Sequence, residues 1–237
     1  MSKLIHLDKV NAYYGQAHIL HGVSLEVKEG EVVCLLGRNG VGKTTSLKSI
    51  MGLVNVKKGG IYFQQEEITN HTPHDIFKKN AIGYVPEDRR IFASLSVREN
   101  LMIGQLNAPK NRRWDINKVF EMFPVLKEKQ NRSGAYLSGG EQQMLAIARC
   151  LMGDPKIMML DEPCEGLAPI VVQELEESIK KLHQEGMTMI LVEQSLRLAK
   201  TLGDRVYIMN KGEITYSGDR ESLLNDSSLV SELMGIG

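Results

Sequence analysis

Apolar residues along the chain follow two spacings, one typical of strands and one typical of helices. Apolar runs and alternating apolar positions predict strands at 4–8, 18–28 (with 11–15 between these two), 31–36, 59–63, 81–87, 156–161, 186–192, 205–209 and 212–217. Helical spacing predicts helices at 44–51, 74–80, 169–184 and 194–202, and a short amphipathic helix within 219–237. Because strands and helices alternate over most of the chain, we expect an α/β fold with a mainly parallel sheet.

The middle of the chain interrupts this alternation. From Ser96 to about Cys150 the spacing is helical, and Pro124 ends one amphipathic segment at 115–123. We therefore predict a helical subdomain at about 88–153, inserted into a core at about 1–87 and 154–237. The first strands alternate as half-buried antiparallel strands do, and they predict an antiparallel β subdomain at the N-terminus.

Composition limits the class of protein. The 237 residues include 29 basic and 29 acidic side chains, without the basic excess of a nucleic-acid-binding protein. No apolar run reaches the length of a membrane span, and the first residues lack the apolar segment of a secretory signal. We expect a soluble, cytosolic protein that binds no nucleic acid but is able to dock on a membrane protein. Cys34, Cys150 and Cys164 have no paired spacing and are interpreted as reduced packing residues.

A glycine-rich segment follows the strand predicted at 31–36. It reads Gly37, Arg38, Asn39, Gly40, Val41, Gly42, Lys43, Thr44, and it fits the phosphate-loop pattern G-x-x-x-x-G-K-[ST] throughout. The glycines let the backbone wrap around an anion, and the N–H groups that open the next helix point at the phosphates. In this pattern Lys43 contacts the β- and γ-phosphates and the Thr44 hydroxyl binds Mg²⁺. A turn that merely ends a strand would not require this lysine and threonine.

Two carboxylates end the apolar run at 156–161. A carboxylate at the C-terminal end of a buried parallel strand lies beside the phosphate loop, so Asp161 is expected to hold Mg²⁺. Glu162 is expected to polarise the attacking water, and such general-base help increases a rate about 10²–10⁴-fold. The alternative is an acidic strand end that caps the following helix. The phosphate loop upstream favours the catalytic interpretation.

A third motif, Leu137–Gln143, reads Leu-Ser-Gly-Gly-Glu-Gln-Gln. Ser138 stands where a helix N-cap is expected, and Ser138 with Gly139 and Gly140 would form a second anion cradle at the helix N-terminus. The alternative is a flexible glycine turn. Two phosphate cradles that are too far apart for one nucleotide suggest two chains that share two nucleotides head to tail.

The three motifs, in this order and spacing, resemble those of the ATP-binding-cassette (ABC) ATPases, and the resemblance covers essentially the whole chain. It implies a phosphate-loop ATPase that uses ATP and Mg²⁺. It also implies that Tyr14 stacks on adenine, a contact worth about 1–3 kcal/mol on bases, with Tyr13 as the alternative. The segment 165–168 is expected to pass between two subunits.

The resemblance assigns three sets of site residues. The expected catalytic residues are Glu162, Gln194 and Lys43. The expected metal ligands are Thr44, Glu87 and Asp161. The expected nucleotide-binding residues are Tyr14, Gly37, Arg38, Asn39, Gly40, Val41, Gly42, Lys43, Thr44, Thr45, Ser138, Gly139, Gly140 and Glu141.

Two positions depart from the commonest pattern of the family. Glu87 replaces a glutamine, and a carboxylate is at least as suitable a ligand for a hard cation. Gln194 replaces a histidine. Its amide donates a hydrogen bond but carries no charge, so it should stabilise the transition state less than a protonated histidine would. We therefore expect no proton transfer through position 194.

The sequence around these two positions resembles a narrower group within the family. The segments Val85–Phe92, Glu162–Pro169 and Leu191–Gln194 resemble the ATP-binding subunit of branched-chain amino-acid importers, and subunits of urea and short-chain amide importers are closely similar. This resemblance implies a second ATPase subunit, identical or paralogous, a membrane permease and, indirectly, a solute-binding protein. It places the chain at the cytoplasmic face of the inner membrane, as a peripheral protein.

Residues 88–104 are the expected permease-facing surface, although apolar residues there, such as Phe92, Leu95 and Met102, are equally consistent with a subdomain core. Two other classes of protein fit the sequence less well. A DNA-repair or translation ABC ATPase usually has two cassettes or a long coiled-coil insertion, and this chain shows neither. A small-molecule kinase would have no use for the motif at 137–143.

Overall fold

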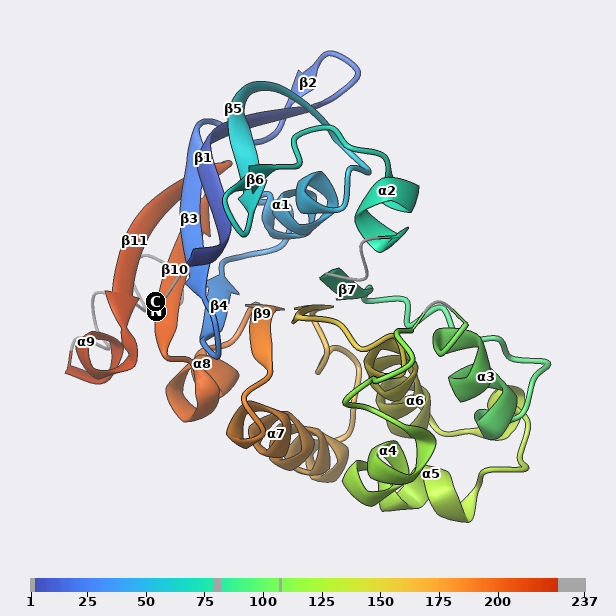
Figure 1. Cartoon of the computed structure of the whole chain (residues 1–237). Coiled ribbons are helices and arrows are strands. Elements are labelled where there is room, and N and C mark those ends of the chain that lie inside the picture. Colours follow the sequence, from blue (N-terminus) through green and yellow to red (C-terminus); the bar gives the residue numbers. More distant parts are fainter. Residues whose placement is uncertain (1–2, 79–81, 107, 226–237) are drawn as a thin grey trace.

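The computed structural model describes residues 3–78, 82–106 and 108–225. Figure 1 shows an antiparallel sheet above, a second sheet through the middle and a group of helices below and to one side. The fold therefore combines α and β elements as the sequence predicts. The predicted boundaries of the helical subdomain, near residues 87 and 153, stay a prediction.

The antiparallel sheet is built around one long strand. Strand β1 pairs with β2, β3 and β5, and β5 pairs with β6. Their bounds are β1 Lys3–Tyr14, β2 Ala17–His18, β3 Val23–Lys28, β5 Asn55–Phe63 and β6 Glu66–Glu67. Buried and exposed residues alternate along most of β3, as the sequence predicts.

Several predicted bounds are wrong in this sheet. Strand β5 begins at Asn55, four residues before the strand predicted at 59–63, and β6 was not predicted. Residues 11–14 continue β1 rather than separating two strands, because the strand pairs with β5 as far as Tyr13 across two register shifts. The strand expected at 18–28 begins only at Val23, after a turn in which Gly22 has φ of 74°. Neither an irregular register nor a turn of this kind is visible in apolar spacing.

The second sheet is mainly parallel, with strand order β11-β10-β4-β9-β8-β7. Strands β10, β4, β9, β8 and β7 are parallel, and β11 forms an antiparallel hairpin with β10. Every residue of β4, β8 and β9 is buried, which confirms the buried strands predicted from continuous apolar runs. The bounds are β4 Val32–Leu36, β7 Ile82–Val85, β8 Ile157–Asp161, β9 Thr188–Glu193, β10 Arg205–Asn210 and β11 Glu213–Asp219.

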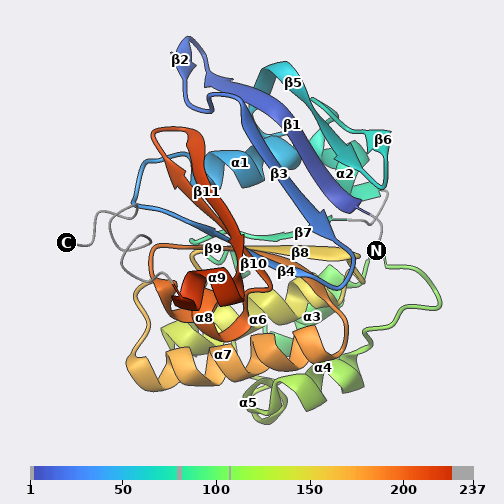
Figure 2. The same cartoon turned by 90° about the vertical axis from the view of Figure 1, so that its left-hand side faces the viewer.

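Helices cover both faces of this sheet. Helix α1 (Lys43–Ile50) lies between the two sheets, and its Leu47 and Ile50 belong to the core cluster that joins them. On the other face, Figure 2 shows α6 (Gly139–Leu151), α7 (Pro169–Gln184) and α8 (Leu196–Leu202). Helix α2 (Pro73–Lys78) and helix α9 (Arg220–Asn225) complete the set outside the middle of the chain. The remainder of the tail helix predicted at 219–237 lies outside the described residues. So do the end of the helix predicted at 74–80 and the first residue of the strand predicted at 81–87.

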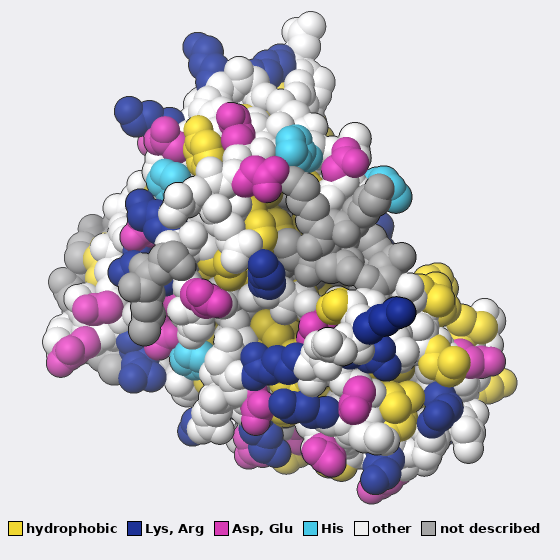
Figure 3. Space-filling view, viewed as in Figure 1, with side chains coloured by type: hydrophobic (Ala, Val, Ile, Leu, Met, Phe, Trp, Pro, Cys, Tyr) yellow, Lys and Arg dark blue, Asp and Glu magenta, His cyan; other side chains and the backbone are white. Residues whose placement is uncertain are grey.

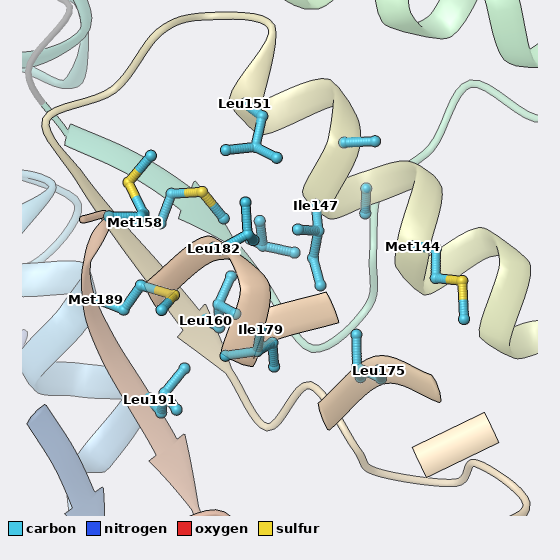
Figure 4. Close-up of a cluster of buried hydrophobic side chains, with 14 of the residues drawn as sticks. Met144, Ile147, Leu151, Met158, Leu160, Leu175, Ile179, Leu182, Met189 and Leu191 are labelled. Carbon is cyan, nitrogen blue, oxygen red and sulfur yellow. The ribbon is translucent and has the colours of Figure 1, made fainter. Parts of the chain in front are cut away.

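The middle of the chain is helical, as predicted. It contains α3 Val97–Gly104, α4 Ile116–Met122, α5 Pro124–Glu128, the 3₁₀ helix Gly134–Tyr136 and α6. Asp115 caps α4 through a hydrogen bond from Lys118 N, and Pro124 opens α5 at a position where its missing N–H is not needed. Figure 4 shows how α6 and α7 pack on the sheet, with Ile147 and Ile179 directed toward Leu160 of β8.

Candidate functional site

The phosphate loop, residues 37–44, connects β4 to α1. Gly37, Gly40 and Gly42 have φ of 155°, 79° and 112°. A Cβ at Gly37 would lie 2.5 Å from the carbonyl oxygen of Met209, and a Cβ at Gly42 would lie 2.8 Å from Leu20 Cδ2. Only glycine therefore fits at 37 and 42 without displacement of neighbours. Gly42 caps α1 without a side-chain hydrogen bond, which leaves the first N–H groups of the helix able to bind an anion.

Lys43 is buried, and its ammonium group binds oxygen atoms on three sides. Nζ donates to the carbonyl oxygens of Gly37 (2.9 Å) and Arg38 (3.0 Å). It also forms an ion pair with Glu162 Oε1 at 3.1 Å. A phosphate in the loop would offer Lys43 the same kind of oxygen ligand, so the cradle and its cation fit a nucleotide. The ion pair with Glu162 was not predicted from the sequence.

Glu162 lies just after β8, in a backbone conformation that non-glycine residues seldom adopt. Its φ is 47°, and its N–H donates to Val192 O at 3.0 Å. Gln194, just after the neighbouring strand β9, donates from Nε2 to Glu162 Oε2, and the same Nε2 lies 3.4 Å from Glu165 Oε2. Left-handed backbone at a side chain that faces a site is typical of functional positions. The two strand ends thus bring Glu162 and Gln194 together, as adjacent parallel strands allow.

Asp161, the last residue of β8, accepts two hydrogen bonds. Thr44 Oγ1 donates to Oδ1 at 2.9 Å, and the hydroxyl of Tyr84 donates to Oδ2 at 2.9 Å. Burial raises the pKa of Asp161, and the neighbouring Glu162 raises it further, while the two hydrogen bonds lower it. Tyr84 was missed in the sequence. The only signal for it is its place on β7, which pairs with β8.

Glu87 follows β7 in a loop that borders two adjacent cavities. One, of about 310 Å³, is lined also by Thr44, Tyr84 and Asp161. The other, of about 370 Å³, is lined also by Lys43, Glu162 and Tyr14. Partial burial raises the pKa of the Glu87 carboxyl, and the charges of Glu162 and Asp161 raise it further.

A divalent cation would relieve this crowding of negative charge. Thr44, Asp161 and Glu87 supply a hydroxyl and two carboxylates, which are hard oxygen donors suited to Mg²⁺. Within residues 3–78, 82–106 and 108–225, no group of three His, Cys, Asp or Glu side chains is placed to hold a metal alone. Mg²⁺ usually needs no such group, because it is held by one or two carboxylates together with substrate phosphates.

The two tyrosines considered for adenine differ in their surroundings. The ring of Tyr13 stacks on His18 with centroids 4.2 Å apart, and Lys57 Nζ lies 4.2 Å from the centroid of the Tyr13 ring. Tyr14 is 47% exposed and lines the same cavity as Lys43 and Thr45. Tyr14 is therefore the one with a ring free for a base.

The second cradle is well formed but lies apart from the first. Ser138 caps α6 by accepting from Glu141 N at 3.3 Å, and Glu141 Oε2 accepts from Ser138 N at 2.9 Å, a complete capping box. A Cβ at Gly140 would lie 2.0 Å from Val171 Cγ1, so the glycine is required by the close approach of α7. None of Ser138, Gly139, Gly140 and Glu141 lines either cavity at the phosphate loop.

Comparison with known proteins identifies the family. A family model described as "ABC transporter" matches residues 20–165. The chain belongs to the ABC transporter ATPases. It is 42% identical to the high-affinity branched-chain amino acid transport ATP-binding protein BraG of Pseudomonas aeruginosa, over 98% of this chain and 100% of that protein. It is 34% identical to the lipopolysaccharide export system ATP-binding protein LptB of Haemophilus influenzae, over 94% of this chain and 93% of that protein.

Solved structures of ABC cassettes share the fold. One, an ABC transporter cassette in its ADP conformation, has a TM-score of 0.83 at 27% identity and covers 98% of both chains. Another, a dimeric cassette in a post-hydrolysis state bound to ADP and phosphate, has a TM-score of 0.79 at 26% identity and covers 91% of this chain and 98% of that one. The chain is thus an ABC ATPase with a phosphate-loop core. Among the described residues, no helix is both long enough and apolar enough to cross a membrane.

Proposed function

We propose that this ABC ATPase is the ATP-hydrolysing subunit of an importer of branched-chain amino acids. The observation that carries the proposal is the 42% identity with BraG along essentially the whole of both chains. The similarity to a protein of Archaeoglobus fulgidus described as "Probable branched-chain amino acid transport ATP-binding protein LivF" supports it, at 36% identity over 96% of this chain.

In this proposal the two adjacent cavities beside Glu87 hold Mg²⁺ and ATP. The phosphate loop and Lys43 bind the phosphates, with Thr45 buried behind them at the start of α1, and Tyr14 stacks on adenine. Thr44, Asp161 and Glu87 hold Mg²⁺, which neutralises charge on the phosphates when bound. The hydrogen bonds from Thr44 and Tyr84 to Asp161 keep this carboxylate aimed at the cavity.

Hydrolysis is assigned to Glu162 and its neighbours. Glu162 accepts a proton from the attacking water, and Gln194 orients the Glu162 carboxylate by the hydrogen bond to Oε2. Lys43 must move from Glu162 toward the phosphates before Glu162 becomes available as a base, because the two side chains form an ion pair. Gln194 acts as a neutral donor throughout.

We further propose that two cassettes close on two nucleotides. Ser138, Gly139 and Gly140 would bind the γ-phosphate held by the other subunit, and Glu141 maintains this cradle through the capping box and an ion pair with Lys129. The separation of the cradle from the phosphate loop within one chain supports this arrangement. The similarity to a solved dimeric cassette supports it as well. The partner is a second cassette, identical or paralogous.

The permease is proposed to dock in an apolar groove beside the Glu87 loop. The groove has a volume of about 360 Å³ and is lined mainly by apolar residues, including Pro86, Phe92, Ile103 and Ala146. Apolar side chains gather over α3 at the right-hand edge of Figure 3, and Phe92, Met102 and Leu106 are 45%, 54% and 76% exposed. Because the groove adjoins Glu87, a permease segment seated there would sense closure at the nucleotide. Docking would hold the chain at the cytoplasmic face of the inner membrane.

Three other solutes are alternatives to branched-chain amino acids. The sequence of residues 13–15 and of residues 34–42 also resembles subunits of urea and short-chain amide importers. Export of lipopolysaccharide is a further candidate because of the 34% identity with LptB. The chain itself carries no solute site in this proposal, so the permease determines which of these solutes is transported.

The test is co-purification and transport. The chain would be purified from membranes with its permease and solute-binding protein, reconstituted in liposomes and supplied with ATP inside. We expect uptake of leucine, isoleucine or valine at a rate that falls to background with the Lys43→Ala variant. Uptake of urea or an amide alone would favour the alternative importers, and association with a lipopolysaccharide exporter would overturn the import proposal.

A further inference from the structure

The loop that carries Glu87 is held in a conformation that its own sequence disfavours. Arg89 and Arg90, consecutive non-glycine residues, have φ of 60° and 47°. Left-handed backbone is unfavourable at such residues, because the Cβ comes too close to the following carbonyl oxygen. Within the loop, contacts between near neighbours support it. Arg89 N donates to Pro86 O at 2.9 Å, Arg90 N donates to Asp88 O at 2.6 Å, and Arg90 Nε donates to the exposed Asp88 carboxylate at 2.9 and 3.1 Å. The loop therefore needs support from another element to keep this shape.

Arg149, in the last turn of α6, supplies that support. Its Nη2 donates to the carbonyl oxygen of Arg90 at 2.6 Å and lies 3.4 Å from that of Arg89. Its guanidinium also lies over the ring of Phe92, 5.0 Å from the centroid. Arg149 forms no ion pair with any carboxylate in the part of the chain that the structure describes. The partly buried guanidinium of Arg149 thus has as its acceptors the carbonyl oxygens of Arg89 and Arg90, the two residues with left-handed backbone.

The same loop also meets the opposite end of α6. A Cβ at Gly139, the first residue of the helix, would lie 3.1 Å from Arg89 Nη1. The loop therefore contacts both ends of α6. The Arg89 side chain lies beside the N-terminus of the helix, and the carbonyl oxygens of Arg89 and Arg90 accept from Arg149 near the C-terminus of the helix. Helix α6 opens with Ser138, and the loop carries Glu87. One rigid element consequently joins the second anion cradle to the loop at the first cavity.

We propose that Arg149 is a positioning residue, which fixes Glu87 at the metal site by holding the carbonyls of Arg89 and Arg90 against α6. The inference rests on the proposed function, in which Glu87 is a ligand of Mg²⁺. Without the guanidinium, the two strained residues lose their external donor and relax toward right-handed backbone. Glu87, two residues upstream, then leaves its place between the two cavities. Arg149 itself touches neither nucleotide nor metal.

The test is a double-mutant cycle read by metal binding. Mn²⁺ serves as the probe, and its binding to ATP-saturated protein is followed by electron paramagnetic resonance in a Glu162→Gln background, so that ATP persists. We expect Arg149→Ala to raise the dissociation constant of Mn²⁺ at least fivefold. The affinity for ATP in EDTA should change less than twofold, because the phosphate loop is untouched. Arg149→Lys, which keeps charge but loses the forked donor, should give an intermediate value.

The second arm of the cycle separates positioning from a loss of folding. Glu87→Ala should weaken Mn²⁺ binding, and Arg149→Ala should add no further loss in that background. Arg98→Ala, an exposed arginine of α3, is the matched control and should leave Mn²⁺ binding unchanged. If Glu87→Ala weakens Mn²⁺ binding and Arg149→Ala does not, the inference alone is wrong. If Glu87→Ala has no effect, the assignment of Glu87 to the metal fails with it.

Discussion

Lys43 Nζ lies 3.1 Å from Glu162 Oε1, and both side chains are buried, with 3% and 8% of their surface exposed. Removal of either partner of a buried ion pair is destabilising, because the other charge is left uncompensated in a medium of low dielectric. The ion pair therefore links the phosphate-binding lysine to the proposed general base. Phosphates that attract Lys43 would release Glu162, so substrate binding and activation of the base are connected.

The first prediction concerns Glu162→Gln. We expect hydrolysis to fall roughly 10²–10⁴-fold, the usual contribution of a general base. The affinity for ATP should stay the same or increase, since Lys43 loses a competing carboxylate. A steady-state ATPase assay and a fluorescent-nucleotide titration check both parts. Light scattering should show a stable dimer in ATP.

The control for this substitution is Glu177→Gln on α7, which removes a carboxylate away from both cavities. It should leave turnover and nucleotide affinity unchanged. Hydrolysis by Glu162→Gln at the wild-type rate would show that another group is the base. Weaker ATP binding would show that the Lys43–Glu162 ion pair supports the phosphate loop rather than competing with it.

The second prediction separates Tyr14 from Tyr13. Tyr14→Ala should weaken ATP binding about 5- to 150-fold, which corresponds to a stacking contact of about 1–3 kcal/mol. Tyr13→Ala should instead lower the unfolding temperature, because the Tyr13 ring stacks on His18 and lies under Lys57. Nucleotide titration and thermal unfolding of both variants measure the difference. A larger loss of ATP affinity from Tyr13→Ala would reverse the assignment.

Much of the fold could be predicted because apolar spacing reports burial directly. The helix predicted at 169–184 has the observed bounds, since Pro169 opens it and its apolar residues stay in phase. The buried strands ending at Leu36 and Asp161 were predicted for the same reason. By contrast, β1 was predicted too short, because polar residues such as Asp8 and Asn11 interrupt its spacing at the register shift.

The site could be predicted only where a motif fixes it locally. The phosphate loop and the helix cap at Ser138 depend on neighbours in sequence, and both were found in their expected local structures. The hydrogen bond from Tyr84 to Asp161 depends on two strands that are 77 residues apart in sequence. The bonds from Arg149 to the Glu87 loop depend on the packing of α6. Such contacts follow from strand order and helix packing, which spacing in one sequence does not define.

The third prediction uses two matched helix caps. Ser138 and Ser96 each form a complete capping box, at the start of α6 and α3. Replacement of either serine by alanine should cost about 0.5–2 kcal/mol of folding stability. Only Ser138→Ala should also weaken ATP-dependent dimerisation in the Glu162→Gln background, since only that cap is proposed to meet the γ-phosphate of another subunit. Denaturant unfolding and light scattering distinguish the two effects. Equal dimerisation by both variants would refute the trans cradle.

The last prediction concerns Glu193, which is 6% exposed at the end of β9. Burial raises its pKa from 4.5 to about 7, and the charge of Glu162 adds to the increase, although hydrogen bonds from Cys164 and Gln194 oppose it. The folded state therefore holds this proton more tightly than the unfolded state. The stability from the neutral carboxyl is complete below pH 4.5 and is lost as the pH rises through 7.

Glu193→Gln keeps the shape and removes the titration, so its unfolding temperature relative to wild type should increase between pH 5 and pH 8. The contrasting control is Glu185→Gln. Lys118, 2.8 Å away, lowers the pKa of the exposed Glu185 carboxyl, so its contribution is lost at acid pH instead. Thermal unfolding at pH 5, 6.5 and 8 measures both slopes. A pH-independent difference for Glu193→Gln would mean that this carboxyl is already ionised in the folded protein throughout that range, and that its backbone hydrogen bonds outweigh its burial.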